Sequence, residues 1–142
     1  MDLCVAEKSS DATRPTLNGF RILLVEDSWI VAQSLKAMLE LIGATVIGPA
    51  TSLEDATSLA NASPFDVAIM DMDLQGEMAD KLICALHWRG LPVVVVTGCE
   101  VQPEIADKVV AVMQKPIRVE ALLSILRGVR AAIEPDARAS AN

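Results

Sequence analysis

Aromatic residues are scarce in this sequence, and the scarcity limits what its core can be made of. Tyrosine is absent, and two phenylalanines and two tryptophans are the only aromatic side chains in 142 residues. Apolar residues nevertheless make up 52% of the chain, which excludes disorder over its whole length. The core is therefore predicted to be aliphatic, and the length fits one domain with short tails.

Cysteine and positive charge are also scarce. Cys4, Cys84 and Cys99 are an odd number without a C-x-x-C pair, so neither a disulfide framework nor a zinc site is predicted. We expect a reducing, cytoplasmic location. Twelve basic residues against 19 acidic ones give a net charge of −7, which argues against partners such as nucleic acid or an anionic membrane surface.

Long hydrophobic runs are missing as well. The longest uncharged apolar run, residues 91–96, is far too short to span a bilayer. Residues 1–11 have neither the basic start nor the apolar stretch of a signal peptide. We therefore expect neither a membrane-spanning segment nor a targeting segment.

Short apolar segments alternate with segments of helical period along the chain. Strands are predicted at residues 20–25, 44–48, 66–71, 91–96 and 109–113. Helices are predicted at residues 29–42, 52–61 and 78–89, as a short fourth helix at 103–108, and from 119 onward. Ser28 or Asp27 can cap the first helix and Ser52 the second, and Pro49 is expected to close the second strand.

The predicted strands are apolar throughout, as is typical of strands buried on both faces. Helical crossovers between such strands make neighbours parallel, so the sequence predicts an α/β fold with a doubly wound, five-stranded parallel sheet. We expect the domain to cover residues 19–133, between a flexible N-terminal extension at 1–18 and a flexible C-terminal tail at 134–142.

Polar residues follow the predicted strands at the ends where a parallel sheet binds ligands. They are Glu26 and Asp27 after the first strand, Asp71 at the third, Thr97 after the fourth and Lys115 after the fifth. We expect three carboxylates, one hydroxyl and one ammonium group to gather at one edge of the sheet. Glu26 and Asp27 could also serve only to cap the following helix, where negative charge suits the helix dipole.

The carboxylates of this set, Glu26, Asp27 and Asp71, would repel one another, and each would raise the pKa of the others unless a cation lay between them. A hard divalent cation such as Mg²⁺ prefers oxygen ligands of this kind. With the metal held, Asp71 could attack a phosphoryl group as a carboxylate nucleophile. The metal, Lys115 and Thr97 would then neutralise the phosphoryl oxygens.

In their order and spacing, these residues resemble the receiver domains of bacterial two-component response regulators. The matching features are the Glu26-Asp27 pair, Asp71, Thr97 and the pair Lys115-Pro116, and the resemblance covers about residues 19–133. It implies a flavodoxin-like (βα)5 fold. It also implies a phosphoacceptor that takes phosphate onto Asp71 from a histidine kinase or a histidine phosphotransfer protein.

The resemblance also implies a role for each residue of the site. Asp27 and Asp71 would bind Mg²⁺ through their side chains, Glu26 through water and Asp73 through its backbone carbonyl. Thr97 would bond the phosphoryl group and move with it. Lys115 would pair with a phosphoryl oxygen, and its peptide bond to Pro116 would be cis, in agreement with the general confinement of cis bonds to X-Pro.

Two departures from the receiver pattern affect how a signal could be passed on. Val112 stands where many receivers have tyrosine or phenylalanine, so a switch that couples Thr97 to an aromatic ring is unavailable. Only 17 residues separate Thr97 from Lys115, which leaves room for a short fourth helix. We expect the domain to stand alone and to signal by contact with a downstream protein, and the sequence leaves open whether a homodimer forms.

Two other functions compete with this interpretation. Asp71-Met-Asp73, with Thr97 and Lys115 later in the chain, also resembles a haloacid-dehalogenase-type phosphatase, an enzyme that works through an aspartyl phosphate. In that family the Asp-x-Asp motif follows the first core strand, whereas here Glu26 precedes it, so the order favours a phosphoacceptor that is not an enzyme. A receiver that serves purely as a binding module is disfavoured by the intact acidic set.

Overall fold

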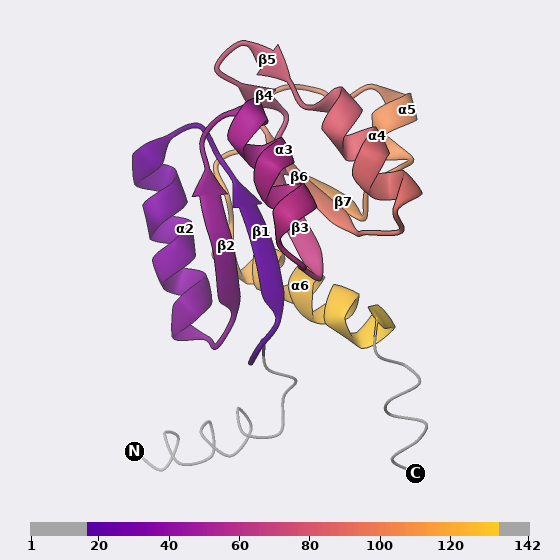
Figure 1. The fold of residues 1–142 in the computed structure, drawn as a ribbon. Coiled ribbons are helices and arrows are strands. Elements are labelled where there is room, and N and C mark those ends of the chain that lie inside the picture. The colour runs from indigo at the N-terminus through magenta and orange to yellow at the C-terminus, as the bar shows by residue number, and fades with distance from the viewer. Residues whose placement is uncertain (1–16, 134–142) are drawn as a thin grey trace, which may run out of the picture.

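A five-stranded parallel sheet with helices on both faces forms the domain (Figure 1). The computed structural model describes residues 17–133; Cys4, most of the expected N-terminal extension and the expected tail at 134–142 lie outside them. The strands are β1 (Arg21–Val25), β2 (Thr45–Ala50), β3 (Val67–Asp71), β6 (Val93–Thr97) and β7 (Ala111–Gln114). They lie in the order β2-β1-β3-β6-β7, every neighbouring pair parallel, which confirms the predicted doubly wound sheet.

The helices divide between the two faces of the sheet. They are α2 (Trp29–Leu41), α3 (Leu53–Ala62), α4 (Asp80–Trp88), α5 (Pro103–Ala106) and α6 (Val119–Ile133). Buried residues of α2 and α6 share one apolar cluster, and those of α3, α4 and α5 share the other. Side chains of β1 alternate between the two: Ile22 and Leu24 lie in the first, Leu23 and Val25 in the second. Within residues 17–133, no helix is both long and apolar enough to cross a membrane.

The core is aliphatic, as the composition predicts. Phe20 and Phe65 are the buried aromatic side chains among the described residues, while both tryptophans are exposed. Leu17 is buried in the same cluster as Ile22, although the expected boundary assigned it to the N-terminal extension. The packed domain therefore includes residue 17.

Serine side chains begin the first two helices, as predicted. The Ser28 hydroxyl accepts a hydrogen bond from the Val31 amide at 3.4 Å, and the Ser52 hydroxyl accepts one from the Asp55 amide at 3.1 Å. Each hydroxyl satisfies an amide that has no partner within its helix. The cap at Ser28 fixes where α2 begins, directly after the acidic pair at the end of β1.

Pro49 does not close the second strand, which is a correction to the sequence-based expectation. β2 runs through a cis Gly48–Pro49 bond to Ala50. The strand lies at the edge of the sheet, where the missing proline amide removes no ladder hydrogen bond on the open side. The Ala50 carbonyl accepts a 2.9 Å hydrogen bond from the Glu26 amide, so the extra length of β2 holds the backbone of the site.

A small hairpin lies between β3 and α4 and was not predicted. Strands β4 (Asp73–Leu74) and β5 (Glu77–Met78) pair antiparallel around Gln75 and Gly76, which have positive φ angles of 57° and 90°. Two consecutive positive φ angles are typical of the tightest hairpin turns. Because the hairpin takes up Met78, α4 begins at Asp80 and not at the predicted residue 78.

The segment of α5 and β7, at one edge of the sheet, has short elements. α5 has four residues, which confirms the expected short fourth helix. β7 begins at Ala111, two residues later than predicted, because Lys108 and Val109 donate backbone hydrogen bonds to α5 carbonyls. Val110 then donates its amide to the Val93 carbonyl and joins the sheet.

Candidate functional site

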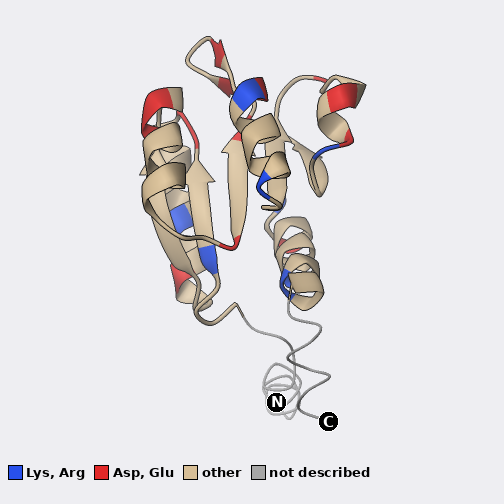
Figure 2. Ribbon diagram, turned by 45° about the vertical axis from the view of Figure 1, so that its right-hand side comes forward, with Lys and Arg blue, Asp and Glu red and all other residues tan. Residues whose placement is uncertain are grey.

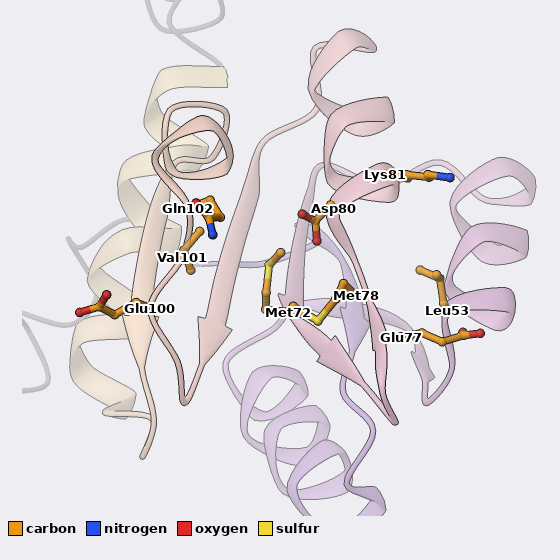
Figure 3. Close-up of a pocket in the computed structure, with 9 residues that line it drawn as sticks. All are labelled: Leu53, Met72, Glu77, Met78, Asp80, Lys81, Glu100, Val101 and Gln102. Atoms are coloured by element: carbon orange, nitrogen blue, oxygen red, sulfur yellow. The ribbon is translucent and has the colours of Figure 1, made fainter.

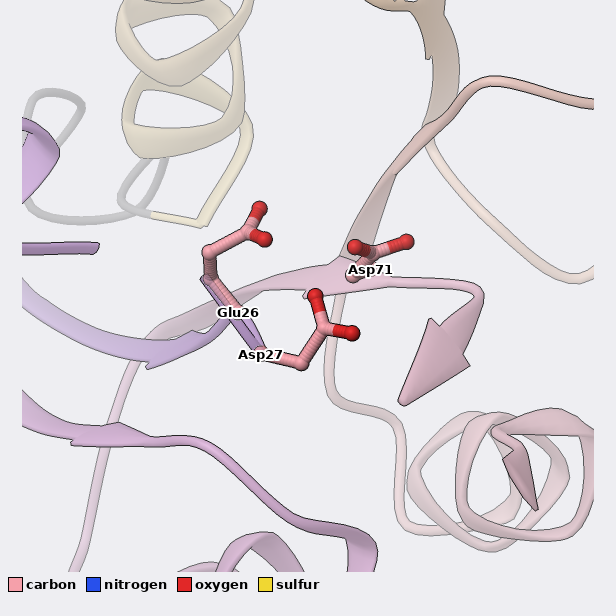
Figure 4. Close-up of side chains that lie close together, drawn as sticks. All are labelled: Glu26, Asp27 and Asp71. Carbon is pink, nitrogen blue, oxygen red and sulfur yellow. The ribbon is translucent and has the colours of Figure 1, made fainter. Parts of the chain in front are cut away.

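Three acidic side chains meet where β1 and β3 end. Glu26 and Asp27 directly follow β1, and Asp71 is the last residue of the neighbouring strand β3. One carboxylate oxygen from each lies within 4.8 Å of those of the other two (Figure 4). This edge is where a doubly wound sheet binds its ligands, so the structure places the three acidic residues together as the sequence predicts.

Glu26 and Asp71 are withdrawn from solvent. Their exposed fractions are 2% and 5%, while Asp27 is half-buried. Burial raises the pKa of Glu26 and the charge of Asp71 raises it further, whereas a 3.1 Å hydrogen bond from the Ser28 amide and the charge of Lys115 lower it. The net direction is upward, so the site favours the protonated form of Glu26 more than water does.

Lys115 supplies the positive charge of the site. Its Nζ lies 2.8 Å from Asp71 Oδ2 and 3.5 Å from Glu26 Oε1. Burial acts to lower the pKa of Lys115, but the hydrogen bond to Asp71 and the charges of Asp71 and Glu26 raise it above its ordinary value overall. The Lys115–Pro116 peptide bond is cis, in agreement with the resemblance.

The hairpin is attached to the acidic cluster by hydrogen bonds. The Gln75 amide donates to Asp27 Oδ2 at 3.2 Å, and the Asp73 amide donates to Asp71 Oδ1 at 3.3 Å. The Asp73 side chain is exposed and accepts a 2.8 Å hydrogen bond from the Gly76 amide. The carboxylate of Asp73 therefore serves its own turn and is not one of the three clustered carboxylates.

Thr97 lies at the same edge, one strand further along. Asp71 pairs in register with Val96, so Thr97 comes one residue beyond the partner of Asp71 and is buried. Its hydroxyl accepts a 3.1 Å hydrogen bond from the Cys99 amide, and its backbone carbonyl accepts one of 2.8 Å from the Lys115 amide. Thr97 and Lys115 are thus connected through the backbone.

Sequence reasoning missed the backbone groups that orient the carboxylates. The amides of Ser28, Asp73 and Gln75 each donate to one acidic residue of the cluster. A side-chain motif gives no signal for these donors. Nothing in the sequence around Gln75 and Gly76 indicates that the Gln75 amide reaches Asp27.

The donor set fits a hard divalent cation. Three carboxylates supply oxygen ligands, and Mg²⁺ binds through one or two carboxylates while it keeps several waters. Lys115 contacts Asp71 through Oδ2, whereas Oδ1 accepts only the weak 3.3 Å hydrogen bond from the Asp73 amide among the contacts of the described residues. Asp71 therefore keeps one oxygen, Oδ1, that does not contact Lys115.

Comparison with protein families finds a match that covers most of the chain. The family profile of the response regulator receiver domain matches residues 22–127, which include all the residues of the site. Among curated proteins, none matches the chain. The family match favours the receiver interpretation over the haloacid-dehalogenase one.

Solved structures agree with this match. A receiver domain described as CheY-like from Methylobacillus flagellatus is 25% identical, with a TM-score of 0.69, over 79% of this chain and 99% of that one. A CheY-like receiver protein from Methanospirillum hungatei is 23% identical, with a TM-score of 0.75, over 84% and 99%. A Burkholderia pseudomallei response regulator solved with a phosphorylated aspartic acid and a calcium ion is 23% identical, with a TM-score of 0.67, over 82% and 72%.

Proposed function

Because the chain belongs to the family of response regulator receiver domains, which are signalling domains, we propose that it is a phosphoacceptor switch of a two-component phosphorelay. Asp71 takes a phosphoryl group from a phosphohistidine on a kinase or a phosphotransfer protein. The observation that supports this most is the position of Asp71, a buried carboxylate between two other carboxylates and an ammonium group.

The transfer is a displacement at phosphorus. An Asp71 carboxylate oxygen forms the new bond to phosphorus while the phosphorus–nitrogen bond of the phosphohistidine breaks and its electron pair returns to the imidazole. The product is an acyl phosphate on Asp71. The Lys115 ammonium group, already 2.8 Å from Asp71, offsets charge on the transferred oxygens.

Glu26, Asp27 and Asp71 would hold Mg²⁺, together with the backbone carbonyl of Asp73. When bound, the metal supplies positive charge that offsets the repulsion among carboxylates and phosphoryl oxygens. The hydrogen bond from the Gln75 amide holds Asp27, and that from the Ser28 amide holds Glu26, so the ligands are oriented before a metal arrives.

Thr97 and Lys115 would report the phosphoryl group to the rest of the domain. The Thr97 hydroxyl can donate a hydrogen bond to a phosphoryl oxygen, and Lys115 would exchange part of its contact with Asp71 for one with phosphate. Because the Lys115 amide donates to the Thr97 carbonyl, movement of either segment displaces the other. Val112 lies exposed on β7 and offers no ring to fill space that Thr97 vacates.

The phosphodonor would dock on an apolar surface that lies beside the site. A hollow of about 330 Å³ lies between α2 and the segment after β7, with Ile30, Pro116 and Val119 among its lining residues. Ile30 and Val119 are exposed large apolar side chains. The partner's phosphohistidine could then reach Asp71, and the switch, acting in the cytoplasm, would pass its signal to a downstream protein by contact.

Labelling with a small phosphodonor tests this function. Acetyl phosphate with Mg²⁺ should add one phosphoryl group to the wild-type protein, seen as an intact-mass increase. Asp71→Asn should remain unlabelled, and Asp73→Asn, which alters an exposed neighbouring carboxylate, should be labelled like wild type. Undiminished labelling of Asp71→Asn would refute the assignment, and continuous turnover of p-nitrophenyl phosphate would indicate a phosphatase.

A further inference from the structure

A second hollow, of about 610 Å³, lies beyond the hairpin and is not lined by the three clustered carboxylates (Figure 3). Its walls come from the start of α3, the β4–β5 hairpin, the start of α4 and the loop after β6. The volume is in the range of pockets that bind a small molecule or a few side chains. Four separate elements therefore line a hollow that takes no part in the proposed phosphoryl transfer.

The lining of this hollow is partly apolar and includes two methionine side chains. Met72 is buried beneath it, and Met78 on β5 is 53% exposed beside it. Leu53 and Val101, both half-buried, complete the apolar lining from opposite sides. Methionine side chains are flexible and polarisable, which suits a surface that adapts to the side chain of a partner.

The rim of the hollow is acidic. Glu77, Asp80 and Glu100 contribute three negative charges against the single positive charge of Lys81. Figure 2 shows further acidic residues on the hairpin and at α5, along the same end of the molecule. Such a rim attracts a cationic partner and repels nucleic acid and acidic peptides.

Asp80 is the polar group directed into the hollow. Its Oδ1 is buried and accepts no hydrogen bond from the part of the chain that the structure describes, although Asp80 is the first residue of α4. Figure 3 shows the carboxylate directed toward the space above Met72. A buried acceptor without a partner is costly, so rotation of the half-buried Asp80 side chain toward a cationic donor in the hollow would be favourable.

We propose that this hollow docks a segment of a partner protein in which an apolar side chain lies next to an arginine or a lysine. The apolar side chain would contact Met72 and Met78, and the cationic group would donate to Asp80. Charge complementarity selects this occupant, because the rim is acidic in a chain whose net charge is −7.

The hollow is also connected to the phosphoacceptor site. Met72 directly follows Asp71, and Glu100 follows the Thr97 to Cys99 turn, so both walls continue from site residues. Phosphorylation should therefore change the affinity of the hollow for its partner. This change in affinity rests on the proposed function, whereas docking to the unphosphorylated protein does not.

A titration without phosphodonor tests the docking alone. The probe is a short fluorescein-labelled peptide that alternates leucine with arginine, and the readout is fluorescence anisotropy. Met78→Ser and Asp80→Asn should each weaken saturable binding about tenfold, since one removes an exposed apolar side chain of the hollow and the other the negative charge of Asp80. Peptides with serine for leucine, or glutamate for arginine, should lose binding as well.

Two exposed residues outside the hollow provide matched controls. Leu41→Ser removes an exposed apolar side chain at the end of α2, and Glu120→Gln removes a negative charge on α6. Both should bind the peptide like wild type, and the ¹³C-methyl signals of Met72 and Met78 should shift during a titration of wild-type protein. Absence of saturable binding, equal weakening by Glu120→Gln and Asp80→Asn, or unmoved methionine signals would overturn the proposal.

A second titration, after labelling with acetyl phosphate and Mg²⁺, tests the link to Asp71. Peptide affinity should change in wild type and stay constant in Asp71→Asn. If docking is confirmed and the affinity does not respond to a phosphoryl group that mass spectrometry shows in place, the connection between the sites is refuted. If Asp71→Asn is labelled as well, the proposed function fails while the docking site stands.

Discussion

The centre of the sheet and its β7 edge differ in how many of their residues are buried. The packed side is the centre of the sheet, where all five residues of β3 and four of five in β1 are buried. The thinner side is the β7 edge, where β7 buries one of four residues and the helix α5 has four residues in all. Regions with few buried apolar contacts open at lower free energy than packed core strands.

The difference separates two tasks within one small domain. The carboxylates of the site stand on the packed side, where burial and backbone amides fix them before any ligand arrives. Lys115 follows the thinner edge strand β7 and reaches back to Asp71, and its amide donates to the Thr97 carbonyl at the end of β6. A charge added at Asp71 is therefore expected to act through Lys115 on the edge of the sheet that buries the fewest residues.

A pair of substitutions, one at a buried position of the packed side and one at an exposed position of the thinner side, carries the largest effect. Leu24→Ala, at a fully buried position of β1, should lower the free energy of unfolding by about 3 kcal/mol, because it leaves a cavity between packed strands. Val110→Ala, at a position 51% exposed beside β7, should cost about 0.5 kcal/mol. Urea unfolding gives both values, and equal costs would contradict the difference in burial between the two positions.

Asp27→Ala tests whether a carboxylate on the packed side binds Mg²⁺. Mg²⁺ affinity should fall at least about tenfold, because loss of a proposed direct ligand should cost no less than loss of an outer-shell partner. Trp29, two residues away and 61% exposed, reports the titration by its fluorescence. Asp73→Asn keeps its backbone carbonyl and should bind Mg²⁺ nearly as wild type does, so an equal loss in both variants would contradict the assignment of Asp27.

Lys115→Ala tests the connection between the sides. Acetyl phosphate should still label Asp71, because the nucleophile and the acidic cluster remain, but the response of the thinner side should be blunted. Hydrogen exchange of residues 97–119 is the measurement, compared before and after labelling. A response as large in the variant as in wild type would show that Lys115 does not transmit the change.

The smallest predicted effect is a dependence of stability on pH at Glu26. Its pKa in the folded state lies above the ordinary value of 4.5, so the folded state binds more protons than the unfolded state between these values. The stability that this group contributes is therefore complete below pH 4.5 and is lost as the pH rises through the folded-state pKa. Glu26→Gln should gain stability relative to wild type as the pH is raised to neutrality.

Urea unfolding at several pH values measures this effect. The variant retains the contact between Lys115 and Asp71, so the positive charge of the site keeps a partner. Glu120→Gln, on the exposed face of α6, serves as the control for the loss of a distant carboxylate. Parallel stability curves for wild type and Glu26→Gln would contradict the upward shift.

Most of the fold could be predicted from the sequence, because strands buried on both faces leave a continuous apolar signal. β3 and β6 show this most clearly, since each is entirely buried. The hairpin could not be predicted in this way, because strands of two residues are too short to show a period. β2 was predicted too short, since Pro49 is a strong breaker signal that an edge strand tolerates.

The sequence also allowed a prediction of which side chains meet at the site. It did not allow a prediction of the hydrogen bonds that orient them. Carboxyl ends of parallel strands bring Glu26, Asp71 and Lys115 to one edge wherever the strands end, so order along the chain suffices. The amides that hold these side chains depend on loop geometry. The attachment of Asp27 to the Gln75 amide, 48 residues away, is visible only in three dimensions.

Chemical trapping of the phosphorylated residue tests the central claim most directly. Borohydride reduces an aspartyl phosphate to homoserine, whose position tandem mass spectrometry reads from the peptide sequence. After treatment with acetyl phosphate and Mg²⁺, we predict homoserine at position 71, and none when the metal is chelated. Homoserine at position 27 or 73, or a phosphate on Thr97 that resists reduction, would contradict the account.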